Sequence, residues 1–185
     1  MGPPSSQQNN KIETVKLKLD LHTHCLEAVN FAHPEPKTVK RILEAIKAQG
    51  LDGIAITDHA ELGDGFAYAV REVIKQHFPG ETLVIPGQEL RRGIHHIVEL
   101  NLPGGLIFRY LAHPGTDIST LNGYLKNIHG LEVENGNQTI NRAEVSAFAQ
   151  HHGLLLLSNS DAHSLSDIGR HYTETSLDEL CTRAR

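Results

Sequence analysis

The chain has 185 residues, of which 39% are apolar and 5% aromatic, and its formal net charge is −5. This acidic balance offers no basic surface for the nucleic-acid backbone, and no apolar run approaches the ~20 residues of a membrane span. The length suits one domain, which can bury about 70% of its unfolded surface.

The amino-terminal segment bears on the domain organisation of the chain, and the cysteines bear on the cellular compartment of the protein. The first ten residues are polar and do not resemble a signal peptide, so residues 1–12 are predicted to be a disordered leader and residues 13–185 a single domain. Two cysteines, Cys25 and Cys181, are too few for a disulfide framework. They favour a reducing compartment, and we expect a cytoplasmic protein. The oligomeric state stays open.

Seven short apolar runs predict β-strands. They are Val15–Leu21, Gly53–Thr57, Leu83–Gly87, His96–Leu100, Leu106–Ala112, Leu131–Glu134 and Leu154–Ser158. Several are apolar at consecutive positions, which is typical of strands covered on both faces. The connection Asn101–Gly105 is too short for a crossover helix, so either the strands on its two sides pair antiparallel or a peripheral element is missing.

Four helices are predicted between these strands. Three show apolar stripes at helical spacing, namely Val39–Ile46, Phe66–Phe78 and Leu121–Ile128. A fourth begins after Asn141, with Glu144 three residues later in the pattern of a capping box, and ends at Gly153. Alternating strands and helices favour a parallel sheet or barrel whose functional groups lie at the carboxyl ends of the strands.

Histidines and carboxylates cluster where the apolar runs end or begin. His22 and His24 are two residues apart on one predicted strand, so their side chains point to the same side. Asp161 and His163 repeat this spacing. Other candidate ligands next to apolar runs are His59, Glu89, His96 and His113, with His95 as a competitor of His96. The oxygen and nitrogen donors of these side chains suit Zn, Mn or Fe. The number of candidate ligands indicates a site for several metal ions.

In these motifs the chain resembles the polymerase and histidinol phosphatase (PHP) family of metal-dependent phosphoesterases. The matching stretches are Asp20–His24, Thr57–His59, Gly87–Glu89, His96–Val98, Ala112–Pro114, Glu132–Gly136 and Asn159–His163. They follow the family's order over roughly residues 16–172. The resemblance implies a distorted seven-stranded (β/α) barrel that holds two or three divalent metal ions at the carboxyl ends of its strands.

The resemblance also implies how the ligands are distributed. The first metal would be held by His22, His24, Glu89 and Asp161. The second would share Glu89 and add His96 and His113. The third would take His59, His163 and a residue beyond His24, for which Glu27 is the candidate and His33 the alternative. Asp20 and Asp58 are expected to orient ligands, and Glu132 and Asn135 either line the pocket or serve only a turn.

The implied activity is hydrolysis of small phosphomonoesters, such as histidinol phosphate or a nucleotide, by a metal-activated water. His59 or His163 would protonate the leaving group if the third metal is absent, and Arg170 would bind the phosphate, with Arg91 and Arg92 as further candidates. One alternative is phosphodiester hydrolysis on nucleic acid, which the acidic charge disfavours. Another is a non-catalytic metal-binding interaction domain, although every principal ligand position is filled. The short Asn101–Gly105 connection leads us to expect an open active-site mouth.

Overall fold

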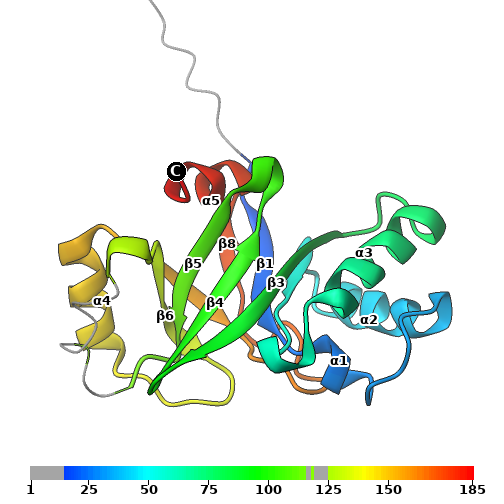
Figure 1. Ribbon diagram of the computed structural model, residues 1–185, viewed down its shortest axis with the longest axis horizontal. Helices are drawn as coiled ribbons and strands as arrows, with labels where there is room; N and C mark the ends of the chain where they lie inside the picture. Colours follow the sequence, from blue (N-terminus) through cyan, green and yellow to red (C-terminus); the bar gives the residue numbers. More distant parts are fainter. Residues whose placement is uncertain (1–14, 116–117, 119–124) are drawn as a thin grey trace, which may run out of the picture.

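The structure is a computed structural model in which residues 15–115, 118 and 125–185 are described (Figure 1). The expected leader at residues 1–12 lies outside the described residues. So do Leu121 and Tyr124, two positions of the predicted stripe Leu121–Ile128. The end of that stripe contains a short 3-10 helix, η4 (Leu125–Asn127).

Eight strands of the described chain form one sheet in the order β7-β6-β5-β4-β3-β2-β1-β8. They are β1 (Leu17–Thr23), β2 (Gly53–Ile56), β3 (Leu83–Arg92), β4 (His95–Asn101), β5 (Ile107–Ala112), β6 (Gly130–Asn135), β7 (Leu155–Asn159) and β8 (Thr173–Thr175). All seven predicted runs form strands, so this part of the prediction is confirmed. The eighth strand, β8, was not predicted, because three residues carry too little periodicity to be recognised.

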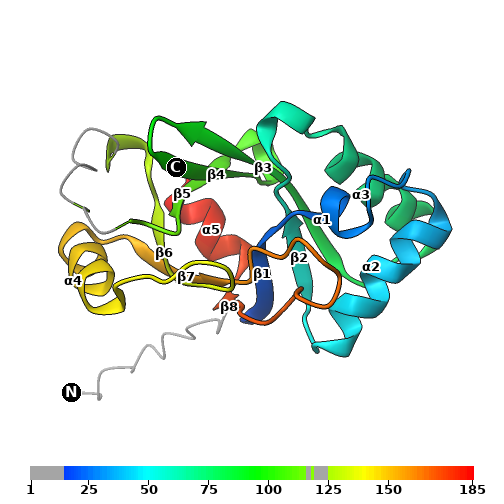
Figure 2. The same ribbon diagram turned by 90° about the horizontal axis from the view of Figure 1, so that it is seen from below.

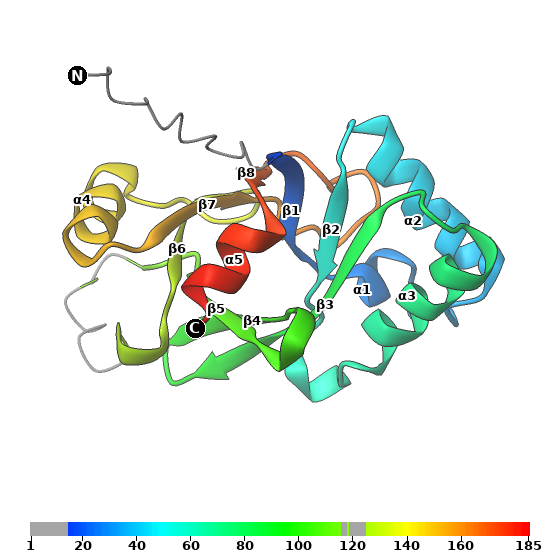
Figure 3. The same cartoon turned by 90° about the horizontal axis from the view of Figure 1, so that it is seen from above.

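The sheet curls until its two ends meet, which gives a nearly closed barrel (Figure 3). The backbone amide of Leu21 in β1 donates to Oδ1 of Asn159 in β7 at 3.0 Å. The hydroxyl of Thr173 in β8 donates to the carbonyl of Ser158 at 3.0 Å and accepts from the amide of Ser158 at 2.9 Å. The short edge strand therefore fills the seam of the barrel, and the predicted barrel fold is confirmed with eight strands in place of seven.

The strand directions show that the sheet is mixed, with parallel and antiparallel pairs. β1, β2 and β3 run parallel, as do β5, β6 and β7, but β4 is antiparallel to both β3 and β5, and β8 is antiparallel to β1. Of the two alternatives for the Asn101–Gly105 connection, antiparallel pairing is the one observed. This connection contains the 3-10 helix η2 (Pro103–Gly105) and lies at the amino end of β5, away from His96 and Ala112. Because the connection lies away from the site, its short length gives no reason to expect an open active-site mouth.

Helices flank the outer face of the barrel (Figure 1). The helices α2 (Pro36–Ala48) and α3 (Gly65–His77) pack on the β1–β3 side, where Ile42, Ile46 and Val70 are fully buried or nearly so. The helix α4 (Arg142–His152) packs against β6 and β7. Its predicted cap is present, because Oδ1 of Asn141 accepts from the amide of Glu144, and Gly153 ends the helix with φ of 66°.

One end of the barrel is closed by packing, so the other end is left for a site. Inside the barrel, Leu19, Val98, Phe108 and Tyr110 form a core with Leu180 of α5 (Leu177–Arg183). Figure 3 shows α5 across this end of the barrel, and Figure 2 views the molecule from the other end. There, β1 runs into the short helix α1 (Cys25–Ala28), and β2 is followed by the 3-10 helix η1 (Ala60–Leu62). Within the described residues, no helix has the length and apolar character needed to cross a membrane.

Candidate metal centre

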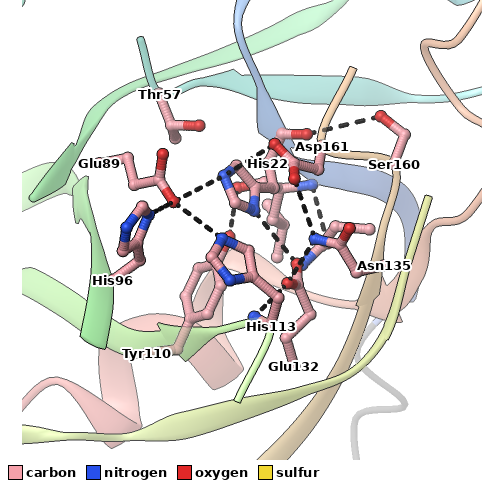
Figure 4. Close-up of polar contacts among 12 residues, drawn as sticks. His22, Thr57, Glu89, His96, Tyr110, His113, Glu132, Asn135, Ser160 and Asp161 are labelled. Carbon is pink, nitrogen blue, oxygen red and sulfur yellow. Dashed lines mark hydrogen bonds and ion pairs between the residues drawn. The ribbon is translucent and has the colours of Figure 1, made fainter. Parts of the chain in front are cut away.

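The carboxylate of Glu89 lies at the centre of the polar cluster at the open end of the barrel (Figure 4). The residue is on β3, is 2% exposed, and has imidazole nitrogens within 3.6 Å of both oxygens. The nitrogens facing Oε1 are His96 Nδ1 at 2.9 Å, His113 Nε2 at 3.2 Å and His22 Nε2 at 3.6 Å. Those facing Oε2 are His59 Nδ1 at 2.9 Å and His24 Nε2 at 3.5 Å. Burial alone would raise the pKa of Glu89, but the hydrogen bond with His113 and the nearby imidazoles of His22 and His24 hold that pKa well below its usual range.

Three groups of described residues bring their ligand atoms within 4.8 Å of one another. These groups are His22, His24 and Glu89; Glu89, His96 and His113; and His24, His59 and His163. The first two overlap the first two predicted metal sites and share Glu89, as expected for a bridging carboxylate. The third contains the predicted His59 and His163, but His24 takes the place proposed for Glu27.

Asp161 completes the first group from the segment that follows β7. Its Oδ1 lies 3.1 Å from Nε2 of His24 and 3.4 Å from Nε2 of His22. His22 lies on β1 and His24 directly follows the strand, and both rings face this carboxylate. Burial would raise the pKa of Asp161, but the adjacent imidazoles of His24 and His22 lower it to about 2. Its backbone has φ of 53°, which is unusual outside glycine and typical of functional sites.

Glu27 and His33, the two residues proposed to complete the third group, differ in their position relative to that group. Oε2 of Glu27 lies 3.6 Å from Nε2 of His163, so this carboxylate is adjacent to the group. His33 is exposed and belongs to none of the three groups found in the described chain. The structure thus brings Glu27, and not His33, next to His163.

The arrangement fits divalent cations. Within the described residues, four buried side-chain atoms have no hydrogen-bond partner, and three of them are ring nitrogens: Nε2 of His22 and both Nδ1 and Nε2 of His24. A buried nitrogen without a partner is costly, and a metal ion placed between these rings and the carboxylates of Glu89 and Asp161 would satisfy it. The fourth atom is Oδ2 of Asp58, whose Oδ1 accepts from the amide of Leu26 at 2.9 Å.

Two buried carboxylates, those of Asp20 and Glu132, contact the candidate ligands or the residues next to them. Asp20 accepts from the hydroxyl of Ser160 at 2.5 Å and from the amide of Gly169 at 2.8 Å, and burial raises the pKa of Asp20 to about 6. Glu132, on β6, lies 3.2 Å from Nδ1 of His22. Burial would lower the pKa of His22, but Glu132 together with Glu89 and Asp161 outweighs burial and raises that pKa well above its usual value. The sequence had left the role of Glu132 open, since its partners are far away along the chain.

Two of the three arginines proposed to bind phosphate, Arg170 and Arg91, have other partners. Nη2 of Arg170 forms an ion pair with Oδ1 of Asp167 at 2.7 Å, and its side chain is 57% exposed. The Nε of Arg91 donates to the carbonyl of Gly93 at 3.4 Å. Arg92 lies at the end of β3, opposite His95. The role of Arg170 in phosphate binding therefore stays a prediction.

The comparisons with known proteins agree with this fold. Residues 140–184, which include α4 and α5, match the PHP-associated family. PsfC from Pseudomonas syringae superposes with a TM-score of 0.68 at 17% identity, covering 91% of this chain and 88% of PsfC. A candidate metal-dependent phosphoesterase from Bifidobacterium adolescentis superposes with a TM-score of 0.69 at 13% identity, covering 89% of this chain and 96% of its own. Among curated protein sequences, none matches the chain.

Fold and ligand pattern together define the class as an α/β barrel with metal-ligand side chains gathered at one mouth. Within this class, the resemblance to the PHP domain family that the motifs predict is confirmed by the match of residues 140–184 and by the shared fold.

Proposed function

We propose that this protein is a metal-dependent phosphoesterase that hydrolyses small phosphomonoesters. The observation that carries the proposal is the position of Glu89, whose two oxygens face imidazoles of two adjacent ligand groups. A carboxylate in this position suits two cations held close together, which is the arrangement that clamps the oxygens of a phosphate ester. The structural similarity to a candidate metal-dependent phosphoesterase supports the same activity.

Each group of residues has a defined part in this proposal. His22, His24 and Asp161 would hold one divalent cation, His96 and His113 would hold a second, and Glu89 would lie between them. The bound cations would supply Lewis-acid activation of water and neutralise charge on the phosphate. The buried Tyr110 donates its hydroxyl to the carbonyl of Leu21 at 2.8 Å and belongs to the apolar core that fills the barrel interior.

His59 and His163 lie at the solvent edge of the site, where a leaving group would depart. Their side chains are 31% and 39% exposed, whereas His22 and His24 are fully buried. A partly exposed imidazole can exchange protons with solvent and deliver one to a leaving oxygen. His59 and His163 therefore either protonate that oxygen or take part in holding a third cation beside it.

The substrate is proposed to be a small phosphorylated molecule. The net charge of −5 disfavours nucleic acid, and Arg170 is the proposed cationic contact to the phosphate once it leaves Asp167. The two cysteines, Cys25 and Cys181, are both free thiols, which supports a cytoplasmic location.

Phosphate release from a panel of esters tests the proposal. The metal-stripped chain would be reloaded with Zn²⁺, Mn²⁺ or Fe²⁺ and offered histidinol phosphate, nucleoside monophosphates, an aryl phosphodiester and a single-stranded oligonucleotide. We expect metal-dependent hydrolysis of the monoesters and its loss in Asp161→Asn. Preferential cleavage of the diester or the oligonucleotide would replace the proposal by a phosphodiesterase. Metal binding without any hydrolysis would indicate a non-catalytic domain.

A further inference from the structure

A single buried carboxylate lies behind both of the central ligand groups (Figure 4). We infer that Glu132 is a positioning residue that aligns His22 in the first group and His113 in the second, so that one side chain sets the geometry of two adjacent metal sites. This inference rests on the proposed function, because it requires that the groups bind divalent cations.

The two oxygens of Glu132 divide their partners between the groups. Oε1 lies 3.2 Å from Nδ1 of His22 and accepts from Nδ2 of Asn159 at 2.9 Å. Oε2 accepts from the backbone amide of His113 at 2.7 Å and from Nδ2 of Asn135 at 2.8 Å. The side chain is 0% exposed. Four donors on a carboxylate sealed from water fix its position, so it can in turn fix the groups that donate to it.

On the His22 side, Glu132 selects which ring nitrogen is left for a metal. A carboxylate can only accept, so Nδ1 of His22 must carry the proton. In the neutral ring that would bind a metal, the opposite nitrogen, Nε2, then offers its lone pair on the side of Glu89 and Asp161, whose oxygens lie at 3.6 and 3.4 Å. That Nε2 is one of the buried atoms without a hydrogen-bond partner. A carboxylate behind a histidine in this way fixes the tautomer and the ring orientation of a metal ligand.

On the His113 side, Glu132 holds the backbone rather than the ring. His113 directly follows β5 and has φ of 28°, a conformation that side-chain-bearing residues rarely adopt. Its amide donates to Oε2 of Glu132 at 2.7 Å, which is the shortest of the four contacts. This conformation brings Nε2 of His113 to 3.2 Å from Oε1 of Glu89. Loss of the Glu132 contact would release the strained turn and, with it, the ring.

Asn135 connects the same carboxylate to Asp161. Its Nδ2 donates to Glu132 at 2.8 Å and to Oδ2 of Asp161 at 3.3 Å. Glu132 thereby reaches three candidate ligands through one buried network, namely His22, His113 and Asp161. A carboxylate needed only for folding would not have to place its partners on the metal-facing side of the barrel. This difference is what an experiment can measure.

Glu132→Gln tests the inference, with Glu134→Gln as the matched control. Gln keeps the size of the side chain, but its amide nitrogen only donates, so one of the two pairs of donors around Glu132 loses its acceptor. Glu134 lies two residues further along β6 and pairs with Arg142 at 2.8 Å and with Ser158 at 2.8 Å, and it belongs to none of the three groups in the described chain. Titration calorimetry with Zn²⁺ and Mn²⁺ on the metal-stripped full chain would give the affinities, elemental analysis the number of ions, and circular dichroism the fold.

We expect Glu132→Gln to weaken metal binding by about 10- to 100-fold at both central sites while the circular dichroism spectrum is retained. Glu134→Gln should bind as tightly as the wild type. If Glu132→Gln does not fold, Glu132→Asp decides the question, because it keeps the charge but is too short to reach both sets of donors. Loss of affinity in that variant supports the inference, and wild-type affinity overturns it.

The outcomes separate this inference from the proposed function. A wild-type chain that binds no divalent cation would refute both. A wild type that binds metal, together with a folded Glu132→Gln variant of equal affinity, would refute the inference alone. Failure of both Glu132 variants to fold would mean that this carboxylate serves folding, and the inference would then be wrong.

Discussion

The hydroxyl of Ser160 donates to Oδ2 of Asp20 at 2.5 Å, although the two residues are 140 positions apart in the chain. The backbone amide of Ser160 also donates to Oδ1 of Asp20 at 3.1 Å, and the amide of Gly169 donates to Oδ2 at 2.8 Å. Asp20 lies on β1, and Ser160 precedes Asp161 directly. This pair therefore joins the first strand to the segment that carries a candidate ligand, and it holds Asp161 opposite His22.

Replacing Ser160 by Ala should destabilise the metal-free protein by about 1–3 kcal/mol, because it removes a donor from a fully buried carboxylate. Urea unfolding monitored by circular dichroism would measure the change. Ser166→Ala is the control, since Ser166 is exposed and its substitution should stay within about 0.5 kcal/mol of the wild type. Equal effects of the two substitutions would contradict the role of the Asp20–Ser160 contact.

The stability of the metal-free protein should depend on the ionisation of Asp20. Its pKa in the folded state is raised from 3.8 to about 6 by burial, so folding favours the protonated form. This contribution is fully present below pH 3.8 and is lost as the pH rises through about 6; the difference between the two pKa values corresponds to about 3 kcal/mol.

Asp20→Asn lacks this titration, so its stability relative to the wild type should increase between pH 4 and pH 7. Urea unfolding of both proteins at a series of pH values, with a chelator present, would test this. A stability difference that does not change with pH would show that Asp20 has the same pKa in the folded and unfolded states.

Replacing Glu89 by Gln should remove at least one bound metal ion. The substitution takes away the negative charge that faces five imidazoles, and hydrolysis should fall by more than the ~100-fold that is typical of losing an outer hydrogen-bond partner. Elemental analysis and phosphate release would measure both effects. Glu99→Gln on the neighbouring strand is the control, because Glu99 pairs with Arg109 at 2.7 Å. Full metal content in Glu89→Gln would exclude a bridging role.

Replacing Glu27 by Gln tests the third group. If the Glu27 carboxylate, 3.6 Å from His163, helps to hold a third cation, this variant should lose one ion and reduce turnover more than substrate binding. The reason is that charge on a leaving oxygen develops mainly in the transition state. Metal counting and steady-state kinetics would measure the two effects. Unchanged stoichiometry and turnover would leave the third group to His24, His59 and His163 alone.

Much of the site could be predicted because its ligands follow local rules. The period of two predicts that His22, on β1, and His24, just after it, lie on one side, and Glu89 on β3 and His113 just after β5 reach the same mouth. The direction of β4 could not be predicted in the same way, because it depends on how Gly93 turns the chain between β3 and β4. The role of Glu132 was equally out of reach, since its partner His22 lies 110 residues away and periodicity carries no information on such contacts.

The turn between β4 and β5 has a practical consequence. Gly104 and Gly105 are exposed, both have positive φ, and the amide of Leu102 donates to the carbonyl of Leu106 at 2.9 Å across the base of the turn. Because this turn lies at the barrel end opposite the ligands, a peptide tag or a fluorescent label inserted between the two glycines should leave the metal centre undisturbed. If the protein were anchored to a sensor surface through this turn, the open end of the barrel, with the candidate ligands, would face the solution.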